Sequence, residues 1–373
     1  LLNWLETYSP QTYRSILRAD KDSAQSAALA QGYHHSILPL CSRRDKQTEI
    51  RWGMDHFKKH FGRKPLGFWL PETAVDIETL EVLVEEGIQF TVLAPHQASA
   101  IRANKNERWI STDDQSLDCR RVYEQLLPSG KSIALFFYDG GISQQVAFHN
   151  LLGCGNDLSQ ALSGPLSSLA DEPRLVSIAT DGESYGHHHR FGEMALARAF
   201  ELLEEQAVTV TNYASFLQAH PPTWQVQINE ESSWSCAHGI ERWRSDCGCG
   251  ATSEAPSQEW RKPLRDLFDE VRATANEKCE PLAGKLFTSP WDARDDSIRG
   301  WGNYLRQPKN QAHRQQARDW LEMQQALLRM DTSCGWFFDN LDRIEPKKNI
   351  QYAQRALQLC AELSGYHGEE EFL

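Results

Sequence analysis

The chain has 373 residues, of which 40% are apolar and 24% charged, a composition typical of a globular protein with a sizeable core. Its formal net charge of −12 argues against nucleic acid as the main partner, because binding phosphate requires a basic surface. No stretch of about 18 consecutive apolar residues occurs, so we expect no membrane span and no membrane partner. Residues 1–8 lack the features of a secretory signal, and the nine scattered cysteines favour reduced thiols, so we expect a cytoplasmic protein.

Between residues 65 and 220, short apolar runs alternate with segments of helical periodicity. The runs predict strands at 66–70, 89–94, 132–138, 175–180 and 208–211. Helices are predicted at 76–86, where apolar residues recur at spacings of three and four, and at 194–206. Repeated β-α-β units imply a parallel sheet, open or closed. Segments 105–130 and 151–173 show neither pattern, and we expect them to be loop insertions.

Helical patterns dominate the last third of the chain. They predict helices at 260–277, 314–330 and 349–363. We therefore expect a β/α domain over residues 1–225 and a mainly helical region over 226–373. We also expect the helical region to contribute aromatic residues to a cleft that holds the active site. The chain starts at Leu1 without an initiator methionine, which indicates a processed chain or a fragment of a longer protein.

Two acidic motifs follow strands of the predicted sheet. Residues 67–72 read GFWLPE, and residues 179–186 read ATDGESYG. The carboxyl ends of parallel strands form the active-site face of α/β folds, so we expect Glu72 and Asp181 to point into a cleft. Cleavage of a glycosidic bond requires two carboxyl groups, one acting at the anomeric carbon and one at the leaving oxygen. The alternative is that each carboxylate only caps the turn or helix that follows it.

These two segments resemble signature regions of glycoside hydrolase family 57, which contains α-amylases, 4-α-glucanotransferases and glucan branching enzymes. The resemblance implies a distorted (β/α)7 barrel followed by a helical region. It also implies a retaining hydrolase or transglycosylase of α-glucans, with Glu72 as the nucleophile and Asp181 as the general acid/base, that needs no cofactor or metal. An oligo- or polysaccharide would be the partner, and the oligomeric state is left open. The similarity is closest to an uncharacterised branch of the family, with residues 332–338 in its helical part.

Further segments are similar to other regions of the family. Residues 33–40 read YHHSILPL and place His34 or His35 where sugar hydroxyls are bound, and residues 136–143 place Asp139 near the cleft. The other substrate contacts expected from the resemblance are Trp69, Glu183, Tyr185, Trp234, His238 and Trp243. The family's first signature, a His-Gln-Pro segment, is absent and would precede residue 1, so the barrel would lack its first strand here.

The acidic residue Glu183 and the histidines after it allow alternative interpretations. If residues 181–183 stay extended, Glu183 faces the same side as Asp181 and could keep it protonated by like-charge repulsion. Otherwise Glu183 would pair with a basic group such as Arg190. The run 187–189 is three histidines, and the related polysaccharide deacetylases bind a metal with one Asp and two His. The His-x3-His spacing of those ligands is not present.

Residues 234–249 form a second candidate site. Trp234, His238 and Trp243 could floor a sugar subsite, or both tryptophans could be core residues. Alternatively, Cys236, His238, Cys247 and Cys249 could hold Zn²⁺, although their C-x-C spacing is tighter than in most structural zinc sites. Three hypotheses therefore remain: an α-glucan-active retaining enzyme, a metal-dependent polysaccharide deacetylase, and a non-catalytic carbohydrate-binding protein.

Overall fold

A computed structural model of the chain describes residues 1–23, 27–103, 105–112, 117–166, 172–250 and 257–368. The chain forms two units that interleave along the sequence. Unit 1 comprises Leu1–Leu29, Pro65–Trp69 and Leu83–Glu230, and unit 2 comprises Ala30–Lys64, Leu70–Val82 and Glu231–Leu373. This division differs from the single boundary at 225/226 that we expected from the sequence, because two earlier segments join the helical part.

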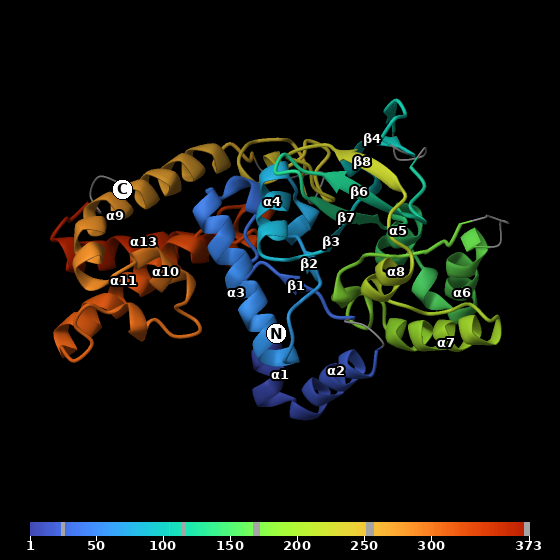
Figure 1. The fold of residues 1–373 in the computed structure, drawn as a ribbon, viewed down its shortest axis with the longest axis horizontal. Coiled ribbons are helices and arrows are strands. Elements are labelled where there is room, and N and C mark those ends of the chain that lie inside the picture. The colour runs from blue at the N-terminus through green and yellow to red at the C-terminus, as the bar shows by residue number, and fades with distance from the viewer. Residues whose placement is uncertain (24–26, 104, 113–116, 167–171, 251–256, 369–373) are drawn as a thin grey trace. The chain divides into compact units, whose positions relative to one another are not determined.

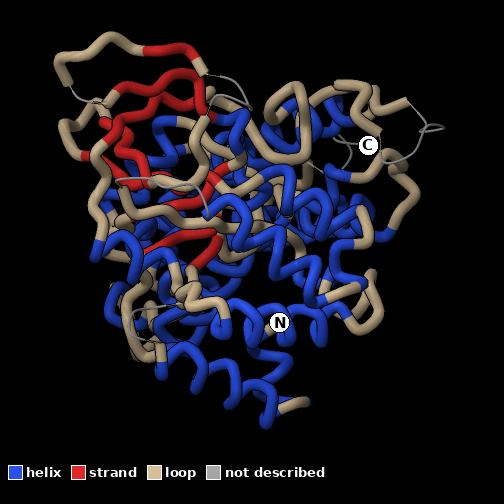
Figure 2. The backbone as a smooth tube through the Cα atoms, turned by 90° about the vertical axis from the view of Figure 1, so that its right-hand side faces the viewer, coloured by secondary structure: helices blue, strands red, loops and turns tan. Residues whose placement is uncertain are grey.

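Unit 1 is built on one mixed sheet, which Figure 2 shows in red. Its strands are β2 (Gly67–Trp69), β3 (Phe90–Leu93), β4 (Ala98–Arg102), β5 (Ile110–Ser111), β6 (Val122–Leu126), β7 (Ser132–Phe137) and β8 (Trp224–Ile228). They lie in the order β2-β3-β7-β6-β8-β4-β5. β2, β3 and β7 pair in parallel, as do β6 and β8, whereas the other pairs are antiparallel. The α/β class is confirmed, and among the described strands no pairing closes the sheet.

The central strands were predictable because they are apolar on both faces. Val92 and Leu93 in β3, and Leu135 and Phe137 in β7, have no exposed surface. Near-continuous apolar runs of this kind are typical of strands that are covered on both sides. The predicted strands at 66–70, 89–94 and 132–138 are accordingly confirmed as β2, β3 and β7.

Several predictions for unit 1 are wrong. Segments 175–180 and 208–211 contain no strand. The first is held by single hydrogen bonds, from Leu175 N to Arg120 O at 2.8 Å and from Asp139 N to Ser177 O at 2.7 Å, instead of by a ladder. The second is largely exposed. Conversely, the predicted loops 105–130 and 151–173 contain β5, β6 and a helix, because short or glycine-flanked elements give weak periodicity.

The helices of unit 1 are α1 (Leu2–Tyr8), α2 (Pro10–Asp22), α5 (Gly140–Phe148), α6 (Gly155–Ser163), α7 (Gly192–Glu205) and α8 (Tyr213–Ala219). Its 3-10 helices are Pro95–Gln97, Leu151–Gly153, Gly164–Leu166 and Gly182–Ser184. α6 and α7 lie side by side in Figure 1. Residues of α5, α6 and α7 share a small apolar core that includes Val146, Leu158 and Ala199. This core supports the segment that carries Asp181, since Val176 and Ile178 pack against it.

Unit 2 is mainly helical, which confirms the expected C-terminal helical region. It contains β1 (Ala30–Gln31), α3 (Arg43–Phe61), α9 (Arg261–Leu286), α10 (Pro290–Asp295), α11 (Gln311–Arg329), α12 (Cys334–Phe337) and α13 (Ile344–Ser364), while α4 (Ile77–Glu85) begins in unit 2 and ends in unit 1. Its 3-10 helices are Leu38–Leu40, Pro71–Thr73, Glu241–Trp243 and Gly302–Tyr304. α9, α11 and α13 contact one another (Figure 1). α9 runs through Pro281, well past its predicted end.

The core of unit 2 combines large aromatic residues with buried ion pairs. Trp243, Trp320 and Trp336 are almost fully buried there. Arg294 donates to Asp45 at 2.7 Å, and both side chains are almost fully buried. Burial of two charges is tolerated only when they are paired and hydrogen-bonded, so this pair ties α10 to α3. None of the described helices is both long and apolar enough to cross a membrane.

Candidate active site

Glu72 lies in a left-handed turn directly after β2. Thr73 N donates to Leu70 O at 2.9 Å and closes this turn. Glu72 has φ 58° and ψ 20°, and Thr73 has φ 49°. A non-glycine residue in this conformation costs about 1–3 kcal/mol, and such strain is found mostly at functional sites. Two consecutive strained residues mean that the surrounding structure holds Glu72 in one orientation.

The surroundings that fix Glu72 belong to the loop after Glu231. Trp234 Nε1 donates to Glu72 Oε2 at 2.9 Å, and Ser235 Oγ donates to the same oxygen at 2.8 Å. The backbone of Trp234 also donates to Glu72 O at 3.1 Å, and Val75 N donates to Ser232 O at 3.0 Å. Among the described residues, Glu72 Oε1 accepts no hydrogen bond. One carboxylate oxygen is thus anchored by two donors, and the other is left to act on a ligand.

The 33–40 segment also lies in unit 2, and a second charged group fixes it. His34 N and Nδ1 contact the two carboxylate oxygens of Glu49 at 2.8 and 2.7 Å. Arg329 Nε approaches His34 Nε2 at 3.4 Å, which makes Nε2 the acceptor and Nδ1 the proton-bearing nitrogen. His34 is therefore largely occupied by protein partners.

His35 is strained in the same way as Glu72. Its φ is 58°, and its carbonyl accepts a hydrogen bond from Ser333 N at 3.1 Å. The next residue, Ser36, bridges to Thr332. Burial, and then the nearby charge of Glu72, raise the pKa of the Cys334 thiol. The segment 332–334 therefore joins the His35 turn to the surroundings of Glu72.

Asp181 lies in unit 1, at the end of the extended segment 175–180. It precedes the 3-10 helix Gly182–Ser184, and no hydrogen bond from that helix reaches its side chain. Its carboxylate is exposed. Ala179 N donates to Ser143 Oγ at 3.1 Å, and Thr180 Oγ1 donates to Tyr185 Oη at 3.3 Å. The backbone before Asp181 is thus held by Ser143, the side chains of Thr180 and Tyr185 join the residues on its two sides, and the carboxylate does not serve as a helix cap.

Asp139 and Glu183 both lie in unit 1. Asp139 caps α5, because its Oδ1 accepts from Ile142 N at 2.9 Å. Glu183 is exposed and lies in a 3-10 helix. The argument that Glu183 faces the same side as Asp181 depended on an extended chain, and this condition is not met. Among the described residues, no three potential metal ligands converge around Asp181 and the histidine run 187–189.

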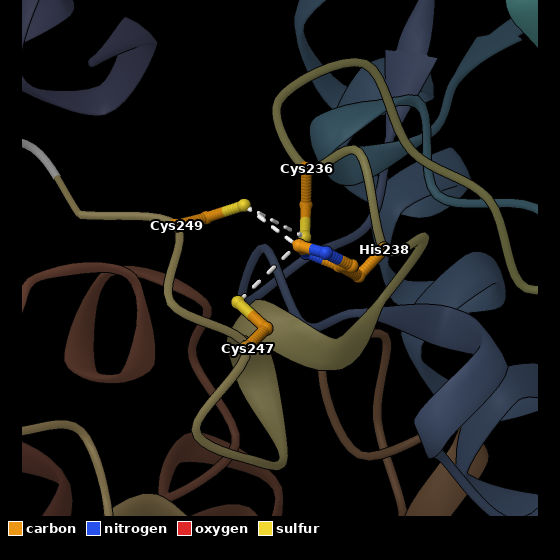
Figure 3. A group of neighbouring side chains, drawn as sticks. All are labelled: Cys236, His238, Cys247 and Cys249. Carbon is orange, nitrogen blue, oxygen red and sulfur yellow. Dashed lines mark hydrogen bonds between the residues drawn. The ribbon is translucent and has the colours of Figure 1, made fainter.

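The aromatic candidates fall into separate groups. Trp234 is half-buried beside Glu72, and Trp69 and Tyr185 are half-buried in unit 1. Trp243 is fully buried in the core of unit 2, so we leave it out of the proposed substrate contacts. His238 lies in a cluster with Cys236, Cys247 and Cys249, whose four candidate ligand atoms are within 4.8 Å of one another (Figure 3).

Residues 1–229 match the sequence profile of glycosyl hydrolase family 57. The chain belongs to this family. Residues 257–373 match a second profile, described as a domain of unknown function, DUF3536. The family 57 match contains both acidic motifs and ends shortly before the loop that anchors Glu72.

Relatives with known names support the same membership. An α-amylase of Pyrococcus furiosus is 22% identical over 248 residues, which cover 63% of this chain and 35% of that protein. A 4-α-glucanotransferase of Thermococcus litoralis is 22% identical over 249 residues, covering 63% and 34%. The chain thus spans about a third of the length of the curated relatives it matches.

Solved structures share the fold of this family 57 chain. An exo-type maltose-forming amylase from Pyrococcus sp. ST04 matches with a TM-score of 0.80 at 17% identity, covering 100% of this chain and 68% of that one. A branching enzyme of family 57 from Thermococcus kodakaraensis matches with a TM-score of 0.62 at 16% identity, covering 97% and 69%. At this level of identity the similarity establishes the fold alone.

Three residues of the site were missed by the sequence analysis. Ser235 donates to Glu72, and Glu49 and Arg329 contact His34. Ser235 stands next to two candidates that we did name, Trp234 and Cys236, but an isolated serine carries no signal of its own. Glu49 is a fully buried carboxylate on α3, and burial of this kind cannot be seen in a helix with many charged residues.

Proposed function

We propose that this family 57 chain is a retaining glycoside hydrolase or transglycosylase that acts on α-glucans. The observation that carries the proposal is the environment of Glu72. Its backbone is strained, its Oε2 accepts two hydrogen bonds, and its Oε1 has no protein partner among the described residues. Family membership supports the substrate class, since relatives are named α-amylase and 4-α-glucanotransferase.

In the proposed reaction, Asp181 gives a proton to the glycosidic oxygen while Glu72 Oε1 attacks the anomeric carbon. The product is a covalent glycosyl-enzyme, in which Oε2 is the carbonyl oxygen of the ester. Asp181 then takes a proton from water or from a sugar hydroxyl, whose oxygen bonds to the anomeric carbon while the ester bond to Glu72 breaks. Negative charge returns to the Glu72 carboxylate in this second step, where Trp234 and Ser235 stabilise it.

Substrate contacts are proposed for those candidates of the sequence analysis that are exposed or half-buried. In unit 2 they are His35 and Trp234, and in unit 1 they are Trp69, Glu183 and Tyr185. We assign His34 and Asp139 a positioning role, because protein partners hold their side chains. His238 is assigned below to a different site.

The test is the stereochemistry and the variant dependence of turnover on maltooligosaccharides and amylose. Wild type should release products with retained α configuration. Nuclear magnetic resonance spectra recorded before mutarotation will show this configuration. Glu72→Gln should abolish turnover without unfolding the chain, while Glu270→Gln, which changes an exposed carboxylate on α9, should behave as wild type. Turnover that survives in Glu72→Gln, or products of inverted configuration, would refute the assignment.

The two carboxylates can be told apart by rescue with azide on an activated α-glucoside. Glu72→Ala opens space for azide on the nucleophile's face, so the glycosyl azide should have inverted configuration. Asp181→Ala leaves the nucleophile in place, so its glycosyl azide should have retained configuration. Asp157→Asn, at an exposed carboxylate of α6, serves as the control in unit 1. Identical azide products from both variants would contradict the two roles.

A further inference from the structure

The loop that anchors Glu72 continues into a cluster of three thiols and one imidazole. Cys236 Sγ lies 3.9 Å from Cys247 Sγ and 3.8 Å from Cys249 Sγ, and Cys249 Sγ lies 3.3 Å from His238 Nδ1. Figure 3 shows the four side chains pointing toward one another. The sulfurs are too far apart for a disulfide, whose S–S bond is about 2.05 Å, and all three cysteines are free.

These separations fit the edges of a metal-centred tetrahedron. With Zn–S bonds of about 2.3 Å and Zn–N bonds of about 2.0–2.1 Å, tetrahedral angles place two sulfurs about 3.8 Å apart and sulfur and nitrogen about 3.5 Å apart. The observed sulfur separations agree with the first value within about 0.1 Å, and the Cys249–His238 contact is about 0.2 Å shorter than the second. All four candidate ligand atoms, from two loops, lie within 4.8 Å of one another, so the side chains gather around one point.

The backbone of both loops is shaped to bring the ligands together. Cys236 O accepts from Gly239 N at 3.1 Å, so residues 236–239 form a tight turn that carries Cys236 and His238. Gly239 has φ 76°, and a Cβ atom there would lie 2.1 Å from Glu231 O, so no other residue fits. Between Cys247 and Cys249, Gly248 has φ 75°, which glycine adopts without strain.

A buried arginine joins the two ligand loops. Arg242 donates from Nη1 to Ser235 O at 3.0 Å and from Nη2 to Cys249 O at 2.9 Å. Gln258 Nε2 also donates to Cys249 O, at 3.1 Å. These contacts fix both loops through their backbones and bring a positive charge next to the ligands. Three thiolates on a divalent ion carry a net charge of −1, which Arg242 would offset.

We propose that Cys236, His238, Cys247 and Cys249 bind one Zn²⁺. Zinc is the metal that tetrahedral thiolate and imidazole ligands select, and four protein ligands leave no open position for a substrate or water. The site is therefore structural. His238 is a zinc ligand in this assignment, which replaces the expectation that it contacts sugar.

The site also has a consequence for Glu72, which rests on the proposed function. Ser235 directly precedes Cys236, so the metal holds the chain one residue away from a donor to Glu72 Oε2. Loss of the metal should loosen segment 232–236 and weaken both donors. We therefore assign the four ligands a positioning role in the reaction, in addition to their structural one.

The first experiment measures metal in the full chain. After expression with zinc and dialysis, mass spectrometry should find about one zinc per chain in wild type and in Glu72→Gln, and almost none in Cys247→Ser/Cys249→Ser. Cys154→Ser changes a thiol of unit 1 outside the cluster and should retain the zinc. Exchange with Co²⁺ should give thiolate-to-cobalt charge-transfer absorption in wild type, where the cluster is intact, and none in Cys247→Ser/Cys249→Ser. A chain without zinc and without such absorption overturns the proposal, as does equal zinc in the double variant.

The second experiment separates a positioning role from general stability. Cys249→His keeps four potential ligands and should therefore retain zinc. This variant keeps the proposal testable in case the double variant fails to fold. Hydrogen exchange of the metal-free chain should rise in residues 231–239 and stay unchanged in α5–α7. On maltooligosaccharides, kcat should fall about tenfold with little change in KM, and Cys249→His should restore it. Zinc binding with unchanged exchange and kcat would contradict positioning, while absence of turnover in wild type would contradict only the proposed function.

Discussion

Removing the hydroxyl of Ser235 tests the anchoring of Glu72 most directly. Ser235→Ala deletes one of the two donors to Oε2 and leaves the backbone and Trp234 in place. A hydrogen bond to a charged group contributes about 1.5–3 kcal/mol. If the full contribution is expressed in the transition state for breakdown of the glycosyl-enzyme, the rate constant of that step should fall about 10- to 150-fold, since each 1.4 kcal/mol is a factor of ten.

The two steps of the reaction make the expected pattern more specific. With a good leaving group, breakdown of the glycosyl-enzyme limits turnover. In the Ser235→Ala variant, the negative charge that returns to Glu72 in this step is stabilised by Trp234 alone. Ser235→Ala should therefore lower kcat on activated substrates and accumulate the covalent intermediate, detectable by intact-protein mass spectrometry. Ser129→Ala, at an exposed turn in unit 1, is the matched control. A kcat on activated substrates within twofold of wild type, with no accumulated intermediate, in a folded Ser235→Ala protein would refute the role of the Oε2 anchor.

Further predictions concern stability, measured by chemical denaturation. Gly239→Ala should destabilise the chain by at least about 1–3 kcal/mol, because φ is positive at this position and the added methyl group would meet a backbone oxygen. Gly284→Ala in α9 is the control: its added methyl group contacts no other atom, so the change should be neutral or stabilising by up to about 1 kcal/mol. Asp45→Asn should cost about 3–5 kcal/mol, because it removes the nearer of the two carboxylates that pair with the buried Arg294 and leaves only Asp295 at 3.8 Å. Burial, and then the charges of nearby basic groups, lower the pKa of His56 to about 4. The unfolded chain then binds more protons, so stability should fall by about 1–2 kcal/mol, after allowance for solvent screening, as the pH drops from about 6.5 to 4, and His56→Phe should flatten this slope. A smaller effect for Gly239→Ala than for Gly284→Ala, a mild Asp45→Asn, or an unchanged slope would each contradict its prediction.

The parts of the fold that could be predicted are those whose side chains report burial by themselves. β3 and β7 are apolar on both faces, and α11 combines strong periodicity with an Asn310 cap, so their sequences identify them. Segment 175–180 is equally apolar, yet it forms no ladder, because its backbone is bound by separate groups such as Arg120 O. Periodicity describes which faces are buried and not which backbone groups pair.

The interleaving of the two units could not be predicted from the sequence for a similar reason. Residues 30–64 and 70–82 belong to unit 2, although segments of unit 1 flank each of them in the sequence. Their amphipathic pattern predicts a buried face, but nothing in it identifies the partner. The fully buried side chain of Trp52 on α3 donates to Arg294 O and Asp295 O, more than 240 residues away in the sequence. Contacts at such separation depend on the complete fold and leave no local signature.

The acidic motifs and the cysteine cluster show how far local chemistry can compensate. Glu72 was identifiable because proline and a strand fix where it stands, and the structure adds that Ser235, 163 residues later, holds its Oε2. The ligands of the proposed zinc site could be named from the sequence, but their C-x-C spacing departs from the common pattern and left the zinc hypothesis open. Positive φ at Gly239 and Gly248 supports the proposal, because turns that use glycine in this conformation carry the four side chains of the cluster. Spacing alone is thus a weaker guide to a metal site than spacing read together with the residues that allow the chain to turn.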